Sequence, residues 1–330
     1  MRLILVAAAG FSFLAAMPLA TAQSLPSKKD ASDLLIKAEN HKRLTEPGRP
    51  PFHFVAKIHY KSGADSLDGT YEVFWAAPDR FREEFRLGSI SETEVALEDK
   101  IYIHRTIPVV TYPQWRLRML TGLPNRDFTP IKPRVSKVYA SRGGAENLTC
   151  LELAAPMKGN TYCLSSLTGE LVSEDYNLAK IGTRLIEDSF IDIGTARYPG
   201  HTLSTIGNET LEVHVEELAS VPRFNSYVFV PPVGASSHDW CVRPDVKKRQ
   251  GEFPDWLLYS GLLAPESANM AGSYVQVAPD GHIEELATLY RDGTARAVSP
   301  LSVSHDRLAI YACNGRPIEY EAVFGVHRTK

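Results

Sequence analysis

Apolar and polar side chains alternate along most of the chain with a period of two, the pattern of strands that bury one face. From residue 52 onward, Phe52, Phe54 and Ile58 share the apolar face, and segments 69–75 and 80–87 repeat the pattern. Further stretches with strand character are 91–97, 100–105, 134–140, 148–156, 160–166, 170–176, 183–190, 209–218 and 225–230. So many consecutive strands predict one large antiparallel sheet, and a sheet of that size tends to curl.

Helical periodicity is confined to two segments. Residues 30–44 place Leu35 and Ala38 on one face, with acidic residues early and basic residues late, which favours a short amphipathic helix. Residues 114–123 are the one helical insertion among the strands. The predicted fold class is therefore mainly β.

A change of character after residue 230 predicts a domain boundary near residue 235. Pro231, Pro232 and Gly234 follow one another closely, which is typical of a linker. Beyond it, strand patterns at 272–279, 282–290, 307–313 and 318–326 are joined by the turn pairs Asp280-Gly281 and Asn314-Gly315. This part is expected to form a small α+β domain.

The N-terminus has the pattern of a secretory signal peptide. An apolar stretch from Leu3 to Leu19 ends at the small-residue triplet 20–22, so residues 1–22 are predicted to be cleaved. An uncleaved membrane anchor is the alternative. The expected location is the periplasm. A net charge of −3 over 330 residues, with basic and acidic residues interleaved, gives no indication of nucleic-acid binding.

Four cysteines in an exported chain favour two disulfides. Cys150 and Cys163 lie on consecutive predicted strands, which suits a hairpin disulfide, and Cys241 with Cys313 is the remaining pair. Zinc ligation is the alternative, but no C-x-x-C occurs and no histidine sits at ligand spacing. No metal or other cofactor is expected.

Motifs of catalysis are missing from the sequence. No G-x-S-x-G, H-E-x-x-H, P-loop or G-x-G-x-x-G occurs. His214 with Glu216, and His282 with Glu284, match half of a zinc-deaminase signature, but the cysteine half is lacking and solvent-facing strand positions explain both. We therefore expect that the protein is not an enzyme and has no catalytic residue.

The run WAAPDRFREEFR at 75–86, with two strands before it and KIYIHR at 100–105 after it, resembles the LolA-type outer-membrane lipoprotein carriers. The resemblance covers about residues 30–230 and assigns residues 23–234 to such a domain. It implies an incomplete β-barrel, a curved antiparallel sheet closed by lid helices, whose cavity holds acyl chains. Ala77 stands where these carriers commonly have arginine before the proline, which puts their lid-closing arrangement in doubt.

The resemblance gives the apolar face of the first strands two interpretations: an ordinary packed core, or the lining of a cavity for an acyl chain. A cavity requires that the protein's own side chains leave this face incompletely filled. Arg80, Arg82 and Arg86 lie on the opposite face and are expected to pair with acidic neighbours, or else to bind a headgroup. The cavity candidates are Phe52, Phe54, Ile58, Tyr71, Val73, Trp75, Phe81 and Phe85.

Residues 235–330 resemble a TonB C-terminal domain in degenerate form. The strand with Val275 before Asp280-Gly281, and the hairpin turn Asn314-Gly315 before Ile318, fit that pattern. Pro300 interrupts the helix that this family carries.

Two functions follow from these resemblances. The first is a periplasmic carrier or chaperone that binds a lipid or a lipoprotein acyl chain. The second is an envelope interaction module whose C-terminal domain docks an outer-membrane protein by strand addition.

Overall fold

The computed structural model describes most of the chain beyond the predicted signal peptide, and residues 1–22 lie outside the described part. Among the described residues, no helix has the length and apolar character needed to cross a membrane. The described residues are 25–46, 48–123, 133–143, 146–155, 158–178, 181–242, 245–248, 270–298 and 310–325.

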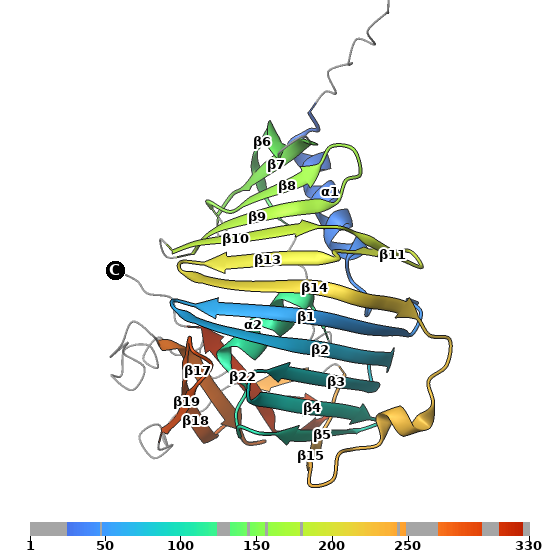
Figure 1. The fold of residues 1–330 in the computed structure, drawn as a ribbon, viewed down its shortest axis with the longest axis vertical. Coiled ribbons are helices and arrows are strands. Elements are labelled where there is room, and N and C mark those ends of the chain that lie inside the picture. Colours follow the sequence, from blue (N-terminus) through green and yellow to red (C-terminus); the bar gives the residue numbers. More distant parts are fainter. Residues whose placement is uncertain are drawn as a thin grey trace, which may run out of the picture.

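Thirteen strands form one open, curved sheet that runs along the length of the molecule (Figure 1). Its spatial order is β15-β5-β4-β3-β2-β1-β14-β13-β10-β9-β8-β7-β6, and all neighbours are antiparallel. The predicted mainly-β fold with a large antiparallel sheet is therefore confirmed. The strands are β1 Phe52–Ser62, β2 Asp65–Ala77, β3 Arg80–Leu87, β4 Ile90–Leu97, β5 Lys100–Arg105, β6 Val135–Gly143, β7 Glu146–Leu153, β8 Thr161–Ser165, β9 Leu171–Leu178, β10 Ile181–Asp188, β13 His201–Ile206, β14 Glu209–Ser220 and β15 Ser236–Asp239.

The alternation in the sequence corresponds directly to the two faces of this sheet. Phe52, Phe54 and Ile58 of β1 are buried, whereas Lys57 between them is exposed. Because neighbouring strands are in register, the buried positions of β1 and β2 meet on the same inner face, with Phe52 opposite Trp75. The outer face carries the polar half of the pattern.

Two helices cover the inner face. Helix α1 (Lys28–His41) begins after Ser27, whose side chain accepts a hydrogen bond from the Asp30 backbone, and packs Leu35 onto strands β7 to β9. Helix α2 (Tyr112–Thr121) ends at Gly122, whose φ of 64° lies in the left-handed region that glycine adopts readily. These are the two helices that the sequence predicts, and they take the position of lids.

Within residues 52–230, one predicted strand is wrong and three strands were missed. Residues 225–230 contain the 3₁₀-helix η1 (Ser226–Phe229), because the Asn225 side chain accepts from the Tyr227 backbone and starts a turn. Strand β13 was missed because its sequence HTLSTI is largely polar and threonine-rich. The short pair β11 (Ile191–Ile193) and β12 (Ala196–Tyr198) was missed as well.

The C-terminal part forms two small sheets. One has the order β19-β18-β17-β22 and the other β16-β20-β21. Strand β19 occupies part of the segment where a TonB-type domain has its helix, and the rest of that segment lies outside the described residues. The strands are β16 Asp245–Lys248, β17 Met270–Val277, β18 Ile283–Tyr290, β19 Ala295–Val298, β20 Ile310–Cys313, β21 Arg316–Pro317 and β22 Tyr320–Gly325.

The C-terminal strands pack against the rest of the protein. Tyr274 and Leu289 of the four-stranded sheet form a buried cluster with Val110 and with Tyr112 of α2. Strand β15 follows the predicted boundary at 235, yet it pairs with β5 at the edge of the large sheet. Whether residues 235–330 fold independently stays a prediction.

Both predicted disulfides are confirmed. Cys150 and Cys163 lie opposite each other on β7 and β8, and Cys241 joins the linker to Cys313 of β20. Neither of these pairs leaves a free thiol, and two disulfides fit an oxidising compartment.

Each disulfide is expected to stabilise the protein by about 2–4 kcal/mol, with the larger effect from the bond that closes the longer loop. Cys241 and Cys313 are 72 residues apart, against 13 for the hairpin pair. Urea unfolding of two double serine variants, one for each pair, measures this difference. Four free thiols in the denatured, unreduced protein would contradict both bonds.

Candidate functional site

The eight cavity candidates lie together on the inner face of strands β1, β2 and β3. All eight belong to one buried cluster, and none is more than 5% exposed. Phe54 makes edge contacts with Tyr71 and Tyr198, with ring centroids 5.9 and 5.7 Å apart. Trp75 stacks on Phe81 at 5.6 Å. The predicted grouping is thus present as a contiguous aromatic surface, which we call the aromatic platform.

The platform is covered in this structure. Leu117 of α2 and Leu123 just beyond it belong to the same buried cluster. A small void with Phe52 in its wall has no room for a water molecule. An acyl chain could therefore reach the platform only after its cover moved, and a ligand-binding role for the eight residues stays a prediction.

Two tyrosines of the inner face hold the C-terminal end of α2. The Tyr71 hydroxyl donates to the Leu123 carbonyl at 2.8 Å, and the Tyr198 hydroxyl donates to the Thr121 carbonyl at 3.0 Å. Both hydroxyls are buried, and burial raises the pKa of the Tyr71 phenol well above its ordinary value. These bonds satisfy carbonyls that a helix end leaves without partners.

Charged groups, rather than apolar packing alone, fasten α2 to the sheet. Arg118 donates to Glu83 at 2.7 and 3.0 Å, to Glu92 at 2.5 Å, and lies 2.9 Å from Glu94. Arg118 is 8% exposed, and its three carboxylate partners are 2% exposed or less. The helix therefore rests on a buried ionic layer.

Arg105 extends this layer into the C-terminal part. It donates two bonds of 2.7 Å to Glu321 of β22 and also contacts Glu92 and Glu94. Together, the two arginines contact four carboxylates, those of Glu83, Glu92, Glu94 and Glu321. Burial, reinforced by neighbouring Glu94, raises the pKa of Glu92 to about 7, although Arg118 and Arg105 oppose the shift.

A second buried ionic contact lies on the same helix. Arg116 donates to Glu209 at 3.1 Å and to the Ser204 hydroxyl at 3.0 Å. Glu209 also accepts from Arg291 of the C-terminal part, and the Tyr60 hydroxyl donates to the Arg291 carbonyl. Helix α2 is thus clamped between the large sheet and the C-terminal strands by arginine–glutamate pairs.

Helix α2 also carries buried polar atoms with no hydrogen-bond partner among the described residues. These include Gln114 Nε2 and Arg118 Nη1. Native proteins contain few such atoms, because an unpaired buried donor costs about 1–3 kcal/mol. Each unpaired donor therefore lowers the stability of the closed arrangement.

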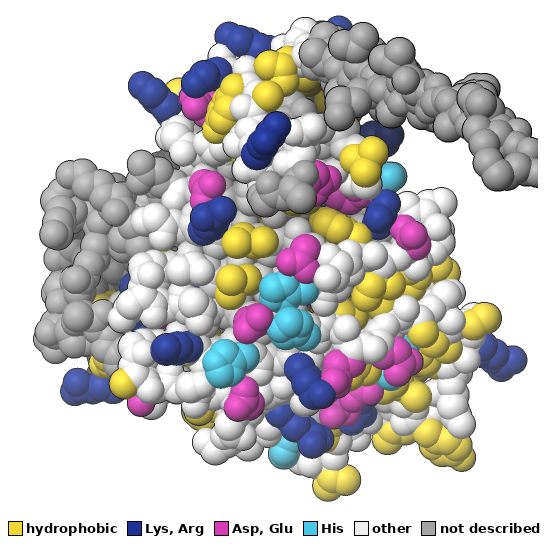
Figure 2. Space-filling model, turned by 45° about the horizontal axis from the view of Figure 1, so that its top comes forward, with side chains coloured by type: hydrophobic (Ala, Val, Ile, Leu, Met, Phe, Trp, Pro, Cys, Tyr) yellow, Lys and Arg dark blue, Asp and Glu magenta, His cyan; other side chains and the backbone are white. Residues whose placement is uncertain are grey.

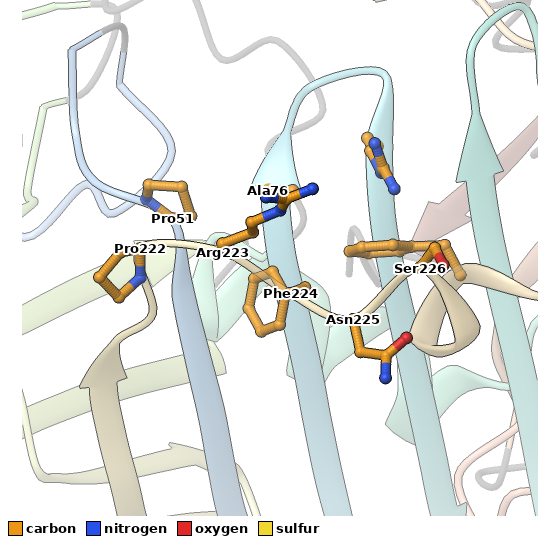
Figure 3. A pocket seen from close by; sticks show the side chains of 9 residues that line it. Pro51, Ala76, Pro222, Arg223, Phe224, Asn225 and Ser226 are labelled. Carbon is orange, nitrogen blue, oxygen red and sulfur yellow. The ribbon is translucent and has the colours of Figure 1, made fainter.

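A pocket on the described surface lies away from the platform. It has a volume of about 420 Å³ and lies between the ends of β1 to β3 and the segment 222–229 (Figure 3). Arg80 lines it and stacks over Phe229 at 4.9 Å, whereas Arg82 donates to the carbonyls of Val228 and Val230. Arg82 thus holds this segment in place and also pairs with Glu84, as expected for the outer face.

In the first His-x-Glu fragment the two residues do not contact each other: Glu216 pairs with Lys57, and His214 contacts Glu212. In the second fragment His282 contacts Asp280 at 2.5 Å and lies 3.9 Å from Glu284. His201, Glu212 and His214 come together on the outer face, with ligand atoms close enough to hold a metal ion. This group was not predicted from the sequence, because strand β13, which carries His201, was not predicted. The expectation that the protein has no metal stays a prediction.

Comparison with known proteins adds limited information. No protein-family model and no curated protein matches the chain. Among solved structures, a LolA superfamily protein from Nitrosomonas europaea matches with a TM-score of 0.40 and 10% identity, over 61% of this chain and 97% of that one. A DUF1329 family protein from Desulfovibrio piger matches with a TM-score of 0.40 and 8% identity, over 62% and 97%.

A third structure is described as a putative outer membrane lipoprotein-sorting protein domain from Vibrio parahaemolyticus. It matches with a TM-score of 0.37 and 6% identity, over 62% of this chain and 97% of that one. Similarity at this level assigns neither a family nor a function to the chain.

Proposed function

We propose that this protein is a periplasmic, non-enzymatic carrier or chaperone for a lipid or for the acyl part of a lipoprotein. In this proposal, the acyl chain binds the aromatic platform in the place that α2 occupies. The observation that carries the proposal is the contrast between an apolar platform and a cover attached to it largely by charged groups.

The attachment of α2 supports a movable cover. Lifting an apolar helix from an apolar face exposes both to water, at a cost of about 25 cal/mol per Å². Arg116 and Arg118 regain hydration when they leave the interior, which offsets part of that cost, because the desolvation of buried ions is itself unfavourable. Gln114 Nε2 and Arg118 Nη1 also gain water as a partner.

An acyl chain would compensate for the apolar part of the cost. It can cover Phe54, Val73 and Trp75, which bear no charge, and each methylene that it buries contributes about 0.8 kcal/mol. Glu83 lies opposite Val73 on the same face, so it must be protonated or keep a cation when Arg118 leaves. The C-terminal part would take part in the exchange, since Glu321 binds Arg105 of the ionic layer and Arg291 binds Glu209, the partner of Arg116.

Mass spectrometry of the intact protein, purified without detergent and sprayed under native conditions, tests whether a lipid accompanies it. A discrete added mass that disappears after denaturation, and that lipid extraction identifies as an acylated molecule, supports the proposal. Unliganded spectra from several expression conditions count against it.

Quenching by a fatty acid brominated along its chain tests where an acyl chain binds. Trp75 lies in the platform, whereas Trp115 stacks on Tyr112 at 5.9 Å on the cover. Saturable quenching should be strongest for Trp75 and should lose its main component in Trp75→Phe. Trp115→Phe is the matched control and should retain it. Equal quenching in both variants, or none in the unmodified protein, contradicts binding at the platform.

The second candidate function, docking by strand addition, rests on the edges of the four-stranded C-terminal sheet. Strands β19 and β22 are each paired on one side only within the described part of this sheet. An unpaired edge can accept an extended segment of another protein. A photo-activatable residue at position 297 of the full chain would then cross-link to one protein partner in the cell envelope. The absence of any cross-linked partner would contradict docking by strand addition.

A further inference from the structure

Two histidines and a glutamate converge on the outer face of the large sheet, on the side of the strands opposite the aromatic platform. His201 Nε2 lies 3.1 Å from Glu212 Oε1, and His214 Nε2 lies 2.9 Å from the same oxygen. All three ligand atoms lie within 4.8 Å of one another. Figure 2 shows histidine side chains gathered beside acidic side chains on this face.

The backbone holds this group in place. His201 of β13 lies directly opposite His214 of β14, and Glu212 is two residues before His214 on the same face of its strand. The imidazole rings stack with centroids 4.4 Å apart and an angle of 15°. Both strands are central in the thirteen-stranded sheet, so the group is built on a rigid support.

A second carboxylate orients one of the rings. His201 Nδ1 lies 3.0 Å from Asp188 of the neighbouring strand β10, and a carboxylate can only accept, so Nδ1 carries the hydrogen. In the neutral ring, Nε2 is then a lone pair facing the Glu212 carboxylate. Either a proton on Nε2 or a metal ion between the two groups makes this contact favourable. In many metal sites a carboxylate accepts a hydrogen bond from one nitrogen of a histidine while the other nitrogen binds the metal, as Asp188 and His201 would here.

We propose that His201, His214 and Glu212 form a binding site for a divalent transition-metal ion of the Zn²⁺ class, with Asp188 as the positioning residue of His201. Two imidazole nitrogens and one carboxylate oxygen are ligands that zinc prefers, at about 2.0–2.2 Å from the metal. Such bonds place adjacent ligand atoms about 3 Å apart, as the two histidine–glutamate distances are. The remaining positions of the ion face solvent.

Other histidines on the described surface lack this arrangement. His53 also contacts two carboxylates, Glu72 at 2.8 Å and Glu217 at 3.0 Å, but it brings a single imidazole. Among the residues that the structure describes, the triad is the one group in which three such ligand atoms converge. His53 therefore provides a matched control on the same face.

Titration of the untagged, chelator-stripped full chain with Zn²⁺ at pH 8, where fewer protons compete with the metal for its ligands, tests the site. One ion should bind per chain. His201→Gln, His214→Gln and Glu212→Gln should each weaken binding at least about tenfold, and Asp188→Asn should weaken it by about 10–100-fold while leaving the ligand set unchanged. His53→Gln should bind as the unmodified protein does.

Cu²⁺ provides the structural readout, because pulsed electron paramagnetic resonance counts the imidazoles bound to it. Two bound imidazoles are expected in the unmodified protein and in the variants His53→Gln and Asp188→Asn. One bound imidazole is expected in each of the variants His201→Gln and His214→Gln. All the substituted side chains are partly exposed, so circular dichroism should be unchanged. Absence of stoichiometric binding, or binding that survives loss of either triad histidine but not of His53, overturns the proposal.

Discussion

Replacing Arg118 with methionine is expected to lower the free energy of unfolding by about 3–5 kcal/mol at pH 8, because it leaves buried carboxylates without their main cation. Arg118 is the shared partner of Glu83, Glu92 and Glu94. Methionine keeps most of the apolar length of the side chain, so the change removes charge rather than packing. Urea unfolding followed by circular dichroism measures the loss.

The loss should depend on pH. Glu92 has its pKa raised by burial from 4.5 to about 7. A carboxyl with a higher pKa in the folded state contributes stability at pH values below its unfolded pKa, and that contribution is lost as the pH rises through the folded value. Without Arg118, Glu92 must stay protonated to a higher pH, at about 1.4 kcal/mol for each pH unit. The deficit of Arg118→Met should therefore be larger at pH 8 than at pH 5.

Two further variants separate this explanation from a general loss of contacts. Adding Glu92→Gln to Arg118→Met should recover part of the stability at pH 8, because an amide needs no counter-charge. Arg86→Met removes an arginine from the exposed face of β3, where its side chain is 70% exposed, and should change stability very little. A deficit of Arg118→Met that is equal at both pH values would contradict the ionic layer.

Phe54→Ala should destabilise the protein by about 3–5 kcal/mol, the usual range for removing a buried aromatic ring. Phe54 is completely buried at the centre of the aromatic platform and contacts the rings of Tyr71 and Tyr198. Because both tyrosines also hold the end of α2, the cavity should loosen that helix first. Hydrogen exchange should show faster exchange in α2 than in α1, whose contacts lie over β7 to β9.

Phe74→Ala is the matched control for this prediction. Phe74 lies on β2 with its ring on the outer face, between His53 at 4.4 Å and Phe224 at 5.9 Å, and it is half-buried. It should cost clearly less than Phe54→Ala and leave exchange in α2 unchanged. Equal losses from the two variants would mean that the inner face is no more tightly packed than the outer one.

The inner face was predictable because alternate residues of a strand point to opposite faces, so the local sequence shows which side chains share a face. The alternation from Phe52 to Phe85 places the eight platform residues on one side without any knowledge of their neighbours. Cys150 and Cys163 were predictable for the same reason, since a hairpin brings them opposite each other. The apolar alternation of segment 225–230 wrongly predicted a strand, because the capping hydrogen bond of the Asn225 side chain favours a helical turn there.

Contacts between distant segments were not predictable. Arg118 and Arg105 read as ordinary polar positions in a helix and at a strand end, and only tertiary packing buries them among glutamates. His201 and His214 are 13 positions apart and meet across the hairpin of β13 and β14, which turns at Gly207-Asn208. This pairing is local in sequence, but it was not predicted because β13 is largely polar.

By itself, the sequence determined the mainly-β class, the two helices, the hairpin disulfide and the apolar side of the first strands, since each depends on neighbours close in the chain. The second disulfide followed because Cys241 and Cys313 are the cysteines that remain. Tertiary structure alone decided that α2 and the C-terminal strands close over that apolar side and that an ionic layer fastens them. These two features arise from pairings across large sequence separations, where burial and charge are set by the fold and not by local pattern.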